Sequence, residues 1–162
     1  MKSKNEHLPI FGIGPMLCYP PGVITVVVTF LSFKGIIPGK IDIPWINTLM
    51  TVMGILLILE GLALFVGADI GGKLVKSIKE NHLKTNGSYR FVRNPCYCLY
   101  FLGCTGVHLI SHNPYLLILS VIYYVWMSVV IKNTEEKWLA ELYGEEYKDY
   151  CSRVNRLIPW PS

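Results

Sequence analysis

The residues best suited to chemistry lie in two polar segments that flank the longest uncharged run of the chain. The first has the sequence GSYRFVRNPCY at residues 87–97, and the second has KNTEEKWLAELYGEEYKDY at residues 132–150. Together they supply hydroxyl, amide, guanidinium and carboxylate groups, which are hydrogen-bonding partners for a polar small molecule.

The uncharged run, residues 94–131, connects these two segments. It is too long for one membrane span and is interrupted by Ser111-His112-Asn113-Pro114, which predicts a tight helical hairpin. A tight hairpin brings its two ends together. We therefore expect five residues to converge at the inner membrane surface, where helix starts supply free N–H groups and the dielectric falls: Arg93, Asn94, Tyr97, Lys132 and Glu135. The alternative is that Arg93 and Tyr97 only anchor a helix at the interface.

Composition excludes a soluble globular domain and a disordered chain. Of 162 residues, 52% are hydrophobic and 16% are charged, against about 25% charged in soluble domains, and the mean hydropathy is +0.40. We expect one all-α integral membrane domain over residues 1–162, with the lipid bilayer as a partner and no nucleic acid despite a net charge of +4. Five cysteines without a paired framework indicate reduced thiols.

The apolar segments predict a polytopic protein with about four transmembrane helices, of which the last two form the hairpin. Pro20-Pro21 interrupts the first apolar run, so we expect the first helix to start there and residues 8–19 to be an interfacial lead-in. The predicted spans are about 21–38, 44–68, 94–111 and 114–132. In this topology 13 of the 15 Lys and Arg residues share one side, which places both termini in the cytoplasm.

A short cytoplasmic helix follows the hairpin. The sequence NTEEKWLAELYG has an Asn or Thr cap, acidic residues in the first turn and Gly144 just past the end. Glu135 shares a helical face with Trp138, Leu139 and Leu142, and that face is expected to pack on the membrane domain. Glu136, Lys137 and Glu141 are expected to remain in water.

Four motifs in the last half of the chain resemble the isoprenylcysteine carboxyl methyltransferase family and its phospholipid methyltransferase relatives. They are residues 83–97, Thr134-Glu-Glu, Tyr143-Gly-Glu-Glu-Tyr147 and residues 153–159. The resemblance implies an S-adenosylmethionine-dependent methyltransferase, with the cofactor at the cytosolic ends of the last spans and under the C-terminal helix. A soluble-type nucleotide fold is not expected, because Gly12-Ile-Gly14-Pro is followed by no pattern that opens a Rossmann helix.

The resemblance also implies the site residues, within the motif ranges 82–97 and 132–159. The implied cofactor-binding residues are His82, Leu83, Lys84, Tyr89, Asn94, Pro95, Cys96, Tyr97 and Glu135, with Asn94 standing where the eukaryotic enzymes have histidine. The family arginine that holds the substrate carboxylate falls on Ile131, and Lys132 is the nearest cation. Lysine is a point charge and does not reproduce the bidentate grip of arginine.

The expected substrate is a lipidic or prenylated small molecule that is methylated at a carboxyl oxygen. Arg93, Lys132 and Glu60 are the catalytic or substrate candidates; Glu60 is the single charge in the second span, where it either acts in the site or only snorkels or forms an ion pair. No metal site is expected, since His108 and His112 lack a third ligand nearby. Two alternatives stay open: phospholipid N-methylation, and a non-catalytic helical membrane protein.

Overall fold

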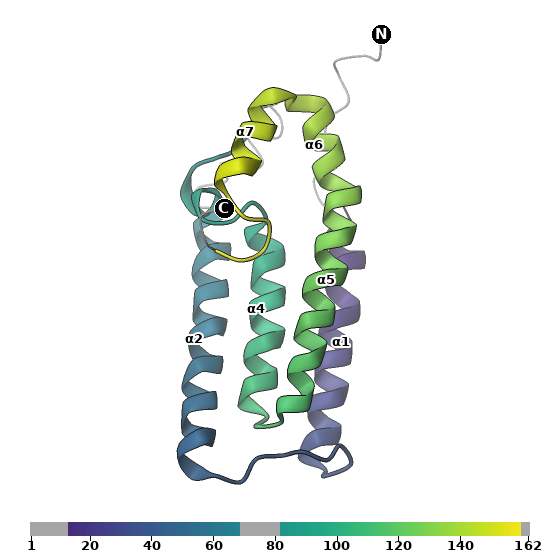
Figure 1. The fold of residues 1–162 in the computed structure, drawn as a ribbon, viewed down its shortest axis with the longest axis vertical. Coiled ribbons are helices and arrows are strands. Elements are labelled where there is room, and N and C mark those ends of the chain that lie inside the picture. Colours follow the sequence, from purple (N-terminus) through teal and green to yellow (C-terminus); the bar gives the residue numbers. More distant parts are fainter. Residues whose placement is uncertain (1–12, 69–81, 160–162) are drawn as a thin grey trace.

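The chain folds into an antiparallel bundle of four long helices with two short helices at one end. The computed structural model describes residues 13–68 and 82–159. The long helices are α1 (Gly14–Phe33), α2 (Pro44–Ala68), α4 (Pro95–Ile110) and α5 (Leu117–Asn133) (Figure 1). The short elements are the 3-10 turns η2 (Gly87–Arg90) and η3 (Pro114–Leu116) and the helices α6 (Glu135–Tyr143) and α7 (Glu145–Arg153). Every one of these elements is helical, which confirms the predicted all-α class.

Among the residues that the structure describes, three helical segments are long and apolar enough to cross a bilayer. They are Gly14–Phe33, Pro44–Ala68 and Pro114–Tyr143, the last of which joins η3, α5 and α6. The fourth apolar helix, Pro95–Ile110, has 16 residues and extends about 24 Å at about 1.5 Å per residue. The protein is thus an integral membrane protein in which α4 is shorter than the hydrocarbon core of about 30 Å.

The first helix begins earlier than the sequence predicts. It starts at Gly14, with Pro15 in its first turn, and Pro20 and Pro21 lie inside it. Proline lacks the N–H that bonds the carbonyl four residues before it, but membrane helices tolerate this loss. The expectation of an interfacial lead-in up to residue 19 was therefore wrong for residues 14–19, and the first turns of α1 reach the same end of the bundle as α6 (Figure 1).

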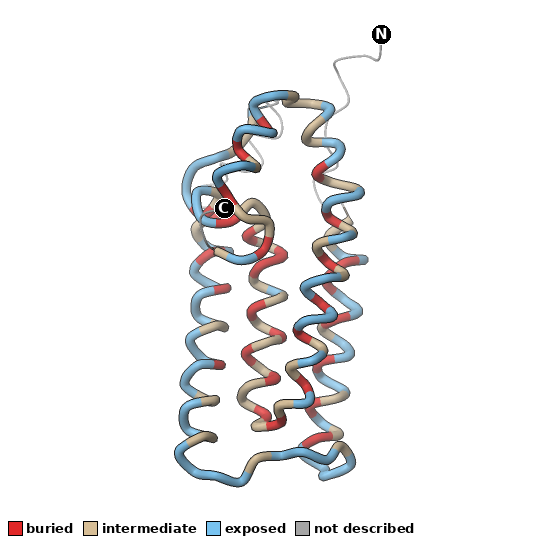
Figure 2. Tube along the Cα trace, in the orientation of Figure 1, coloured by how far each residue is buried: buried red, intermediate tan, exposed pale blue. Residues whose placement is uncertain are grey.

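The α4 helix is the core of the bundle and packs on α2 through glycine. Figure 2 shows α4 with the buried residues distributed along its length. A Cβ atom added to Gly54 would lie 2.6 Å from the carbonyl oxygen of Gly106, and one added to Gly106 would lie 2.5 Å from that of Gly54. Both distances are too short for a real Cβ contact, so glycine at both positions is what allows the two backbones to approach.

A tight turn closes the hairpin between α4 and α5, as predicted. Asn113, fully buried in this turn, donates from Nδ2 to Ser32 Oγ at 3.0 Å and to the carbonyl of Pro38 at 3.1 Å. Its Oδ1 accepts from the backbone N–H of Tyr115 at 3.1 Å. These bonds join the turn to the end of α1, so the hairpin is fixed at the end of the bundle opposite to α6 (Figure 1).

The two histidines of the hairpin are polar packing residues. The ring of His108 is completely buried, 3.2 Å from Thr25 Oγ1 through Nε2 and 2.9 Å from Ser120 Oγ through Nδ1. His112 lies 2.9 Å from Thr51 Oγ1. Within residues 13–68 and 82–159 no group of three or more His, Cys, Asp or Glu side chains is arranged to hold a metal ion.

The C-terminal helical region differs from the prediction in three respects. Gly144, at φ +56°, ends α6 as expected, but a second helix, α7, follows it. Leu139, which was expected to pack on the membrane domain, packs against Tyr147, Tyr150 and Val154 of the C-terminal region. No side chain caps α6, since the Thr134 hydroxyl donates back to the carbonyl of Val130 at 2.7 Å.

Candidate functional site

The predicted convergence of Tyr97 and Glu135 is a direct contact. The Tyr97 hydroxyl donates to Glu135 Oε1 at 2.5 Å, joining the first turn of α4 to the first turn of α6. The same oxygen accepts from the backbone N–H of Ile13 at 3.3 Å. Within the described part of the chain the other oxygen, Oε2, makes no hydrogen bond. The half-buried Glu135 therefore keeps one oxygen available to a ligand.

Apolar side chains surround this contact. Tyr97 is buried in one cluster with Leu17, Met127, Ile131 and Leu157, to which α1, α4, α5 and the C-terminal segment all contribute. Ile131 and Met127 have no exposed surface. Low dielectric around the carboxylate strengthens any charge-assisted hydrogen bond that it makes.

The start of α4 is fixed by the segment that follows α7. Asn94 occupies the N-cap position, but its side chain caps no helix N–H. Its Nδ2 donates instead to the carbonyl of Arg156 at 3.2 Å. Pro95 follows as a fully buried first helical residue, and Cys96 is half-buried. Asn94 thus joins the start of α4 to the C-terminal segment, and these two segments form one wall.

A cluster of two arginines and one glutamate lies beside this wall. Arg93 donates to Glu136 Oε1 from Nη2 at 2.8 Å and from Nε at 3.2 Å. Arg156 donates to Oε1 from Nε at 2.9 Å and to Oε2 from Nη2 at 2.6 Å. The hydrogen bonds and charge of Glu136 raise the pKa of the Arg156 guanidinium above its ordinary value, against the opposing effect of burial.

Glu136 corrects the prediction that this residue remains in water. It is 8% exposed, and its carboxylate is bonded to two partly buried guanidinium groups that compensate its charge. The prediction failed because helical periodicity identifies the apolar face of α6 but not a distant cation. Arg156 was missed for the same reason.

Backbone contacts complete the junction. Arg93 Nη1 donates to the carbonyls of Cys151 and Val154 at 3.0 and 2.7 Å. The backbone N–H of Arg93 donates to the carbonyl of Asn155 at 2.8 Å. The Tyr150 hydroxyl donates to the carbonyl of Tyr89 at 2.6 Å. All three side-chain nitrogens of Arg93 are therefore bonded to protein atoms.

The other predicted site residues belong neither to the cluster of two arginines and one glutamate nor to the contact between Tyr97 and Glu135. Lys84 Nζ donates to the carbonyl of Ala68 at the end of α2 and lies 5.3 Å from the centroid of the Tyr89 ring. Leu83 packs against the cluster of Tyr147, Tyr150 and Val154. Exposed positions are occupied by His82, Lys132 and Glu60.

The first turn of α1 is a component of the site that was not predicted from the sequence. Besides the Ile13 N–H bond, a Cβ atom at Gly14 would lie 3.6 Å from the Tyr97 hydroxyl, so the backbone passes close to that side chain. The signal available was the Gly12-Ile-Gly14-Pro sequence, which was considered only as a nucleotide-binding turn and rejected as one.

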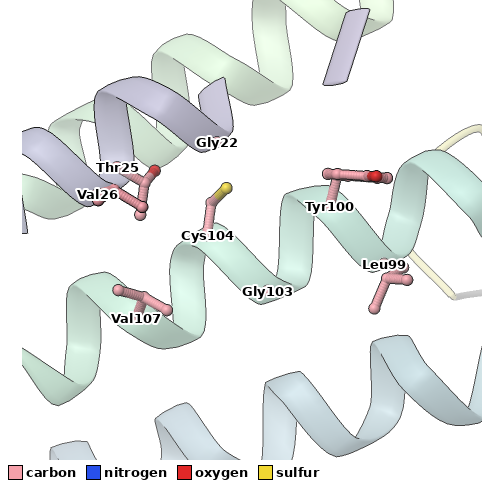
Figure 3. Close-up of a pocket in the computed structure, with 8 residues that line it drawn as sticks. All are labelled: Gly22, Thr25, Val26, Leu99, Tyr100, Gly103, Cys104 and Val107. Atoms are coloured by element: carbon pink, nitrogen blue, oxygen red, sulfur yellow. The ribbon is translucent and has the colours of Figure 1, made fainter. Parts of the chain in front are cut away.

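A groove of about 290 Å³ lies between α1 and α4 (Figure 3). Gly22, Thr25 and Val26 line it from α1, and the α4 side is formed by Leu99, Tyr100, Gly103, Cys104 and Val107. Its end at Tyr100 is one helical turn from Tyr97. A Cβ atom at Gly22 or Gly103 would meet nothing within 4 Å, so the two glycines leave the groove open.

Comparison with known proteins assigns the family. Residues 45–146, from α2 to the beginning of α7, match the phospholipid methyltransferase family model. The chain belongs to this family. The match includes Tyr97, Glu135 and Glu136, so the contacts at the junction of α4 and α6 lie within the family domain.

Relatives of this phospholipid methyltransferase family member differ in the acceptor that their names state. The chain is 31% identical over 167 residues to protein-S-isoprenylcysteine O-methyltransferase of Rattus norvegicus, which is 97% of this chain and 56% of that protein. It is 31% identical over 77 residues to methanethiol S-methyltransferase 1 of Bradyrhizobium diazoefficiens, which is 48% of this chain and 26% of that protein. It is 35% identical over 72 residues to phosphatidylethanolamine N-methyltransferase of Lachancea thermotolerans, which is 44% of this chain and 9% of that protein.

The chain therefore spans little more than half of the rat relative and smaller parts of the other two. No solved structure matches the chain.

Proposed function

We propose that this protein is an S-adenosylmethionine-dependent methyltransferase that methylates a carboxyl oxygen of a lipidic or prenylated molecule at the cytoplasmic membrane face. The observation that carries the proposal is the hydrogen bond between Tyr97 and Glu135 at the end of the bundle. Both residues lie in the part of the chain that matches the family model, and Tyr97 belongs to the apolar cluster. The broad similarity to the rat O-methyltransferase favours a carboxyl acceptor over an amine.

The residues at this junction have the chemistry to hold such a cofactor. Glu135 Oε2, which makes no hydrogen bond to the described residues, can accept from an ammonium group or ribose hydroxyls, and Tyr97 keeps the carboxylate in place. Asn94 and the backbone of the C-terminal segment supply further polar groups beside it. When bound, the cofactor supplies a methyl group on a positively charged sulfur.

The protein contributes mainly positioning and exclusion of water. A carboxylate acceptor needs no general base, and charge is neutralised during methyl transfer from a sulfonium, so a dry and rigid site is suited to the reaction. Met127, Ile131 and Leu157 exclude water on the membrane side. Arg93 acts as a positioning residue, because its donors are bonded to Glu136 and to backbone carbonyls.

The groove between α1 and α4 suits the apolar chain of the acceptor. Its lining contains no charged residue, and it extends along α4 from the turn next to Tyr97. A lipid that enters sideways from the bilayer would place its chain there and its polar end at the junction. We place this junction and both termini in the cytoplasm, following the asymmetry of Lys and Arg.

Transfer of a labelled methyl group tests the proposal. Purified protein in nanodiscs is incubated with methyl-labelled S-adenosylmethionine and either a prenylcysteine analogue or extracted phospholipids. The proposal predicts label in the prenylcysteine analogue that mild base releases, because the product is an ester. Base-stable label in the phospholipids would instead establish N-methylation, and absence of label from both acceptors would contradict the proposal.

A further inference from the structure

The cluster of Arg93, Glu136 and Arg156 carries an unbalanced positive charge. Two guanidinium groups share one carboxylate, and the side chains of Arg93 and Glu136 are only 9% and 10% exposed. Within residues 13–68 and 82–159 the hydrogen bonds of the two arginines involve no second carboxylate. The cluster therefore has a net charge of +1 in a region of low dielectric, where an anion would be bound strongly.

The two arginines differ in how many of their hydrogen-bond donors the protein already uses. Arg93 bonds protein atoms through all three side-chain nitrogens. Arg156 uses Nε and Nη2 for Glu136, and its Nη1 makes no hydrogen bond to the described residues. Its side chain is 22% exposed, more than twice the value for Arg93. An incoming anion would thus find an available donor on Arg156.

The surrounding contacts place Arg156 at the candidate site. Its carbonyl accepts from Asn94, three residues before Tyr97 in the chain. The next residue, Leu157, is buried in the same cluster as Tyr97 and Ile131. Glu136, which orients the guanidinium, directly follows Glu135 in the first turn of α6. A guanidinium held in this way loses little conformational entropy when it binds a ligand.

The other positions that could bind an anion do not supply a suitable donor. Ile131 is apolar and has no exposed surface. Lys132 is exposed, and within the described ranges it makes no hydrogen bond or ion pair that would orient it. Compared with Arg93, Ile131 and Lys132, Arg156 is the described residue that combines an available donor with a fixed orientation.

We infer that Arg156 binds the acidic group of the methyl acceptor through Nη1. The inference rests on the proposed function and specifies its substrate class: an amphiphile with a carboxylate close to the atom that is methylated or identical with it. Glu136 holds one edge of the guanidinium through Nε and Nη2, and the carboxylate of the acceptor binds the Nη1 that this edge leaves available. A neutral acceptor of the same shape would not gain this charge-assisted bond.

Binding of an acid and of its matched amide tests this role. Calorimetry in nanodiscs of zwitterionic lipid would measure the dissociation constants of an N-acetylated prenylcysteine and of its carboxamide, without S-adenosylmethionine. Arg156→Gln should weaken binding of the acid by about tenfold or more, the usual value of a hydrogen bond to a charged group, and leave the amide within about twofold. Arg156→Lys, which keeps the positive charge, should bind the acid more tightly than Arg156→Gln does and less tightly than the wild type.

Arg153→Gln is the matched control, because it removes the same charge at an exposed position of α7 whose ion pair with Asp149 lies outside the cluster. It should keep the preference for the acid over the amide. Equal weakening of acid and amide in Arg156→Gln would show a purely structural role and overturn the inference. Both ligands are measured on the same preparation, so a loss of folded protein does not change their ratio.

Anionic lipid in the nanodiscs distinguishes an acceptor site from a headgroup site. If Arg156 binds phospholipid headgroups instead of the acceptor, Arg156→Gln would keep the acid preference of the wild type in zwitterionic and in anionic nanodiscs, and the inference would be wrong. Ligand binding is measured without turnover. Preferential acid binding that depends on Arg156 would therefore support the inference even if the methyl transfer test of the proposed function failed.

Discussion

Glu135 and Glu136 are consecutive residues of α6 that bind two different parts of the protein. The carboxylate of Glu135 accepts from Tyr97 of α4 and from the backbone of Ile13. The carboxylate of Glu136 accepts from two arginines, one before α4 and one in the C-terminal segment. Because the two residues share one helical turn, the ion cluster fixes the orientation of the turn that carries Glu135.

Loss of the carboxylate charge at Glu136 should destabilise the protein. Glu136→Gln leaves two largely buried guanidinium groups without a counter-charge, and breaking one partner of a buried pair usually costs about 3–5 kcal/mol. Thermal unfolding in detergent would measure the change. Glu145→Gln is the control, since its pair with Lys148 is exposed and such pairs contribute about 1 kcal/mol or less. Equal stability of the two variants would contradict a structural role for the cluster.

The contact between α2 and α4 should not tolerate a methyl group. Gly106→Ala places a Cβ atom 2.5 Å from the carbonyl oxygen of Gly54, so the helices must separate. We expect a loss of about 1–3 kcal/mol in unfolding free energy, as for other overpacked cores. Gly103→Ala, on the same helix, meets nothing within 4 Å and should not be destabilised by crowding. A Gly106→Ala variant as stable as Gly103→Ala would refute this packing.

Filling the groove between α1 and α4 should weaken binding of the acceptor and leave binding of the cofactor unchanged. Gly103→Leu projects a side chain into the groove that the proposed function assigns to the apolar chain. We expect the KM for a prenylated acceptor to rise about tenfold, while the affinity for S-adenosylhomocysteine stays the same. Val125→Leu, on an exposed position of α5, is the control. An unchanged KM in Gly103→Leu would place the chain elsewhere.

The thiol of Cys151 should report whether the C-terminal segment stays closed. Burial raises the pKa of this thiol above its ordinary value, although the nearby Arg93 opposes the shift. The group is therefore neutral at pH 7–8, and its alkylation should accelerate only at higher pH than in the unfolded chain, because the thiolate is the nucleophile. Peptide mapping after iodoacetamide treatment across pH 7–10 measures this. Identical pH profiles for the folded and denatured protein would contradict the closed arrangement.

The sequence predicted the hairpin and one pair of contact residues because these depend on local signals. An uncharged run with a Pro-containing break defines α4, the turn and α5, and the ends of a hairpin must meet, which brought Tyr97 and Glu135 together. The extent of α2 was also predicted correctly, since the run from Pro44 to Ala68 carries its own boundaries.

Contacts between distant segments were not accessible from such signals. Pro20-Pro21 suggested a helix start, but membrane packing accommodates both prolines inside α1, and this extension is what brings Ile13 to Glu135. Glu136 was predicted to be solvent-exposed because its partners lie 43 and 20 residues away along the chain. Periodicity describes the faces of one helix and does not identify which other segment covers them.

Titration of S-adenosylhomocysteine into the purified protein, followed by calorimetry, tests the central claim most directly. The wild type should bind it, and Glu135→Ala should bind about tenfold more weakly or worse, because a charge-assisted hydrogen bond is lost. Tyr97→Phe should show a smaller loss, and Glu141→Ala, an exposed position of the same helix, should match the wild type. Absence of binding to the wild type, or equal affinity in Glu135→Ala, would contradict the assignment of this junction as the cofactor site.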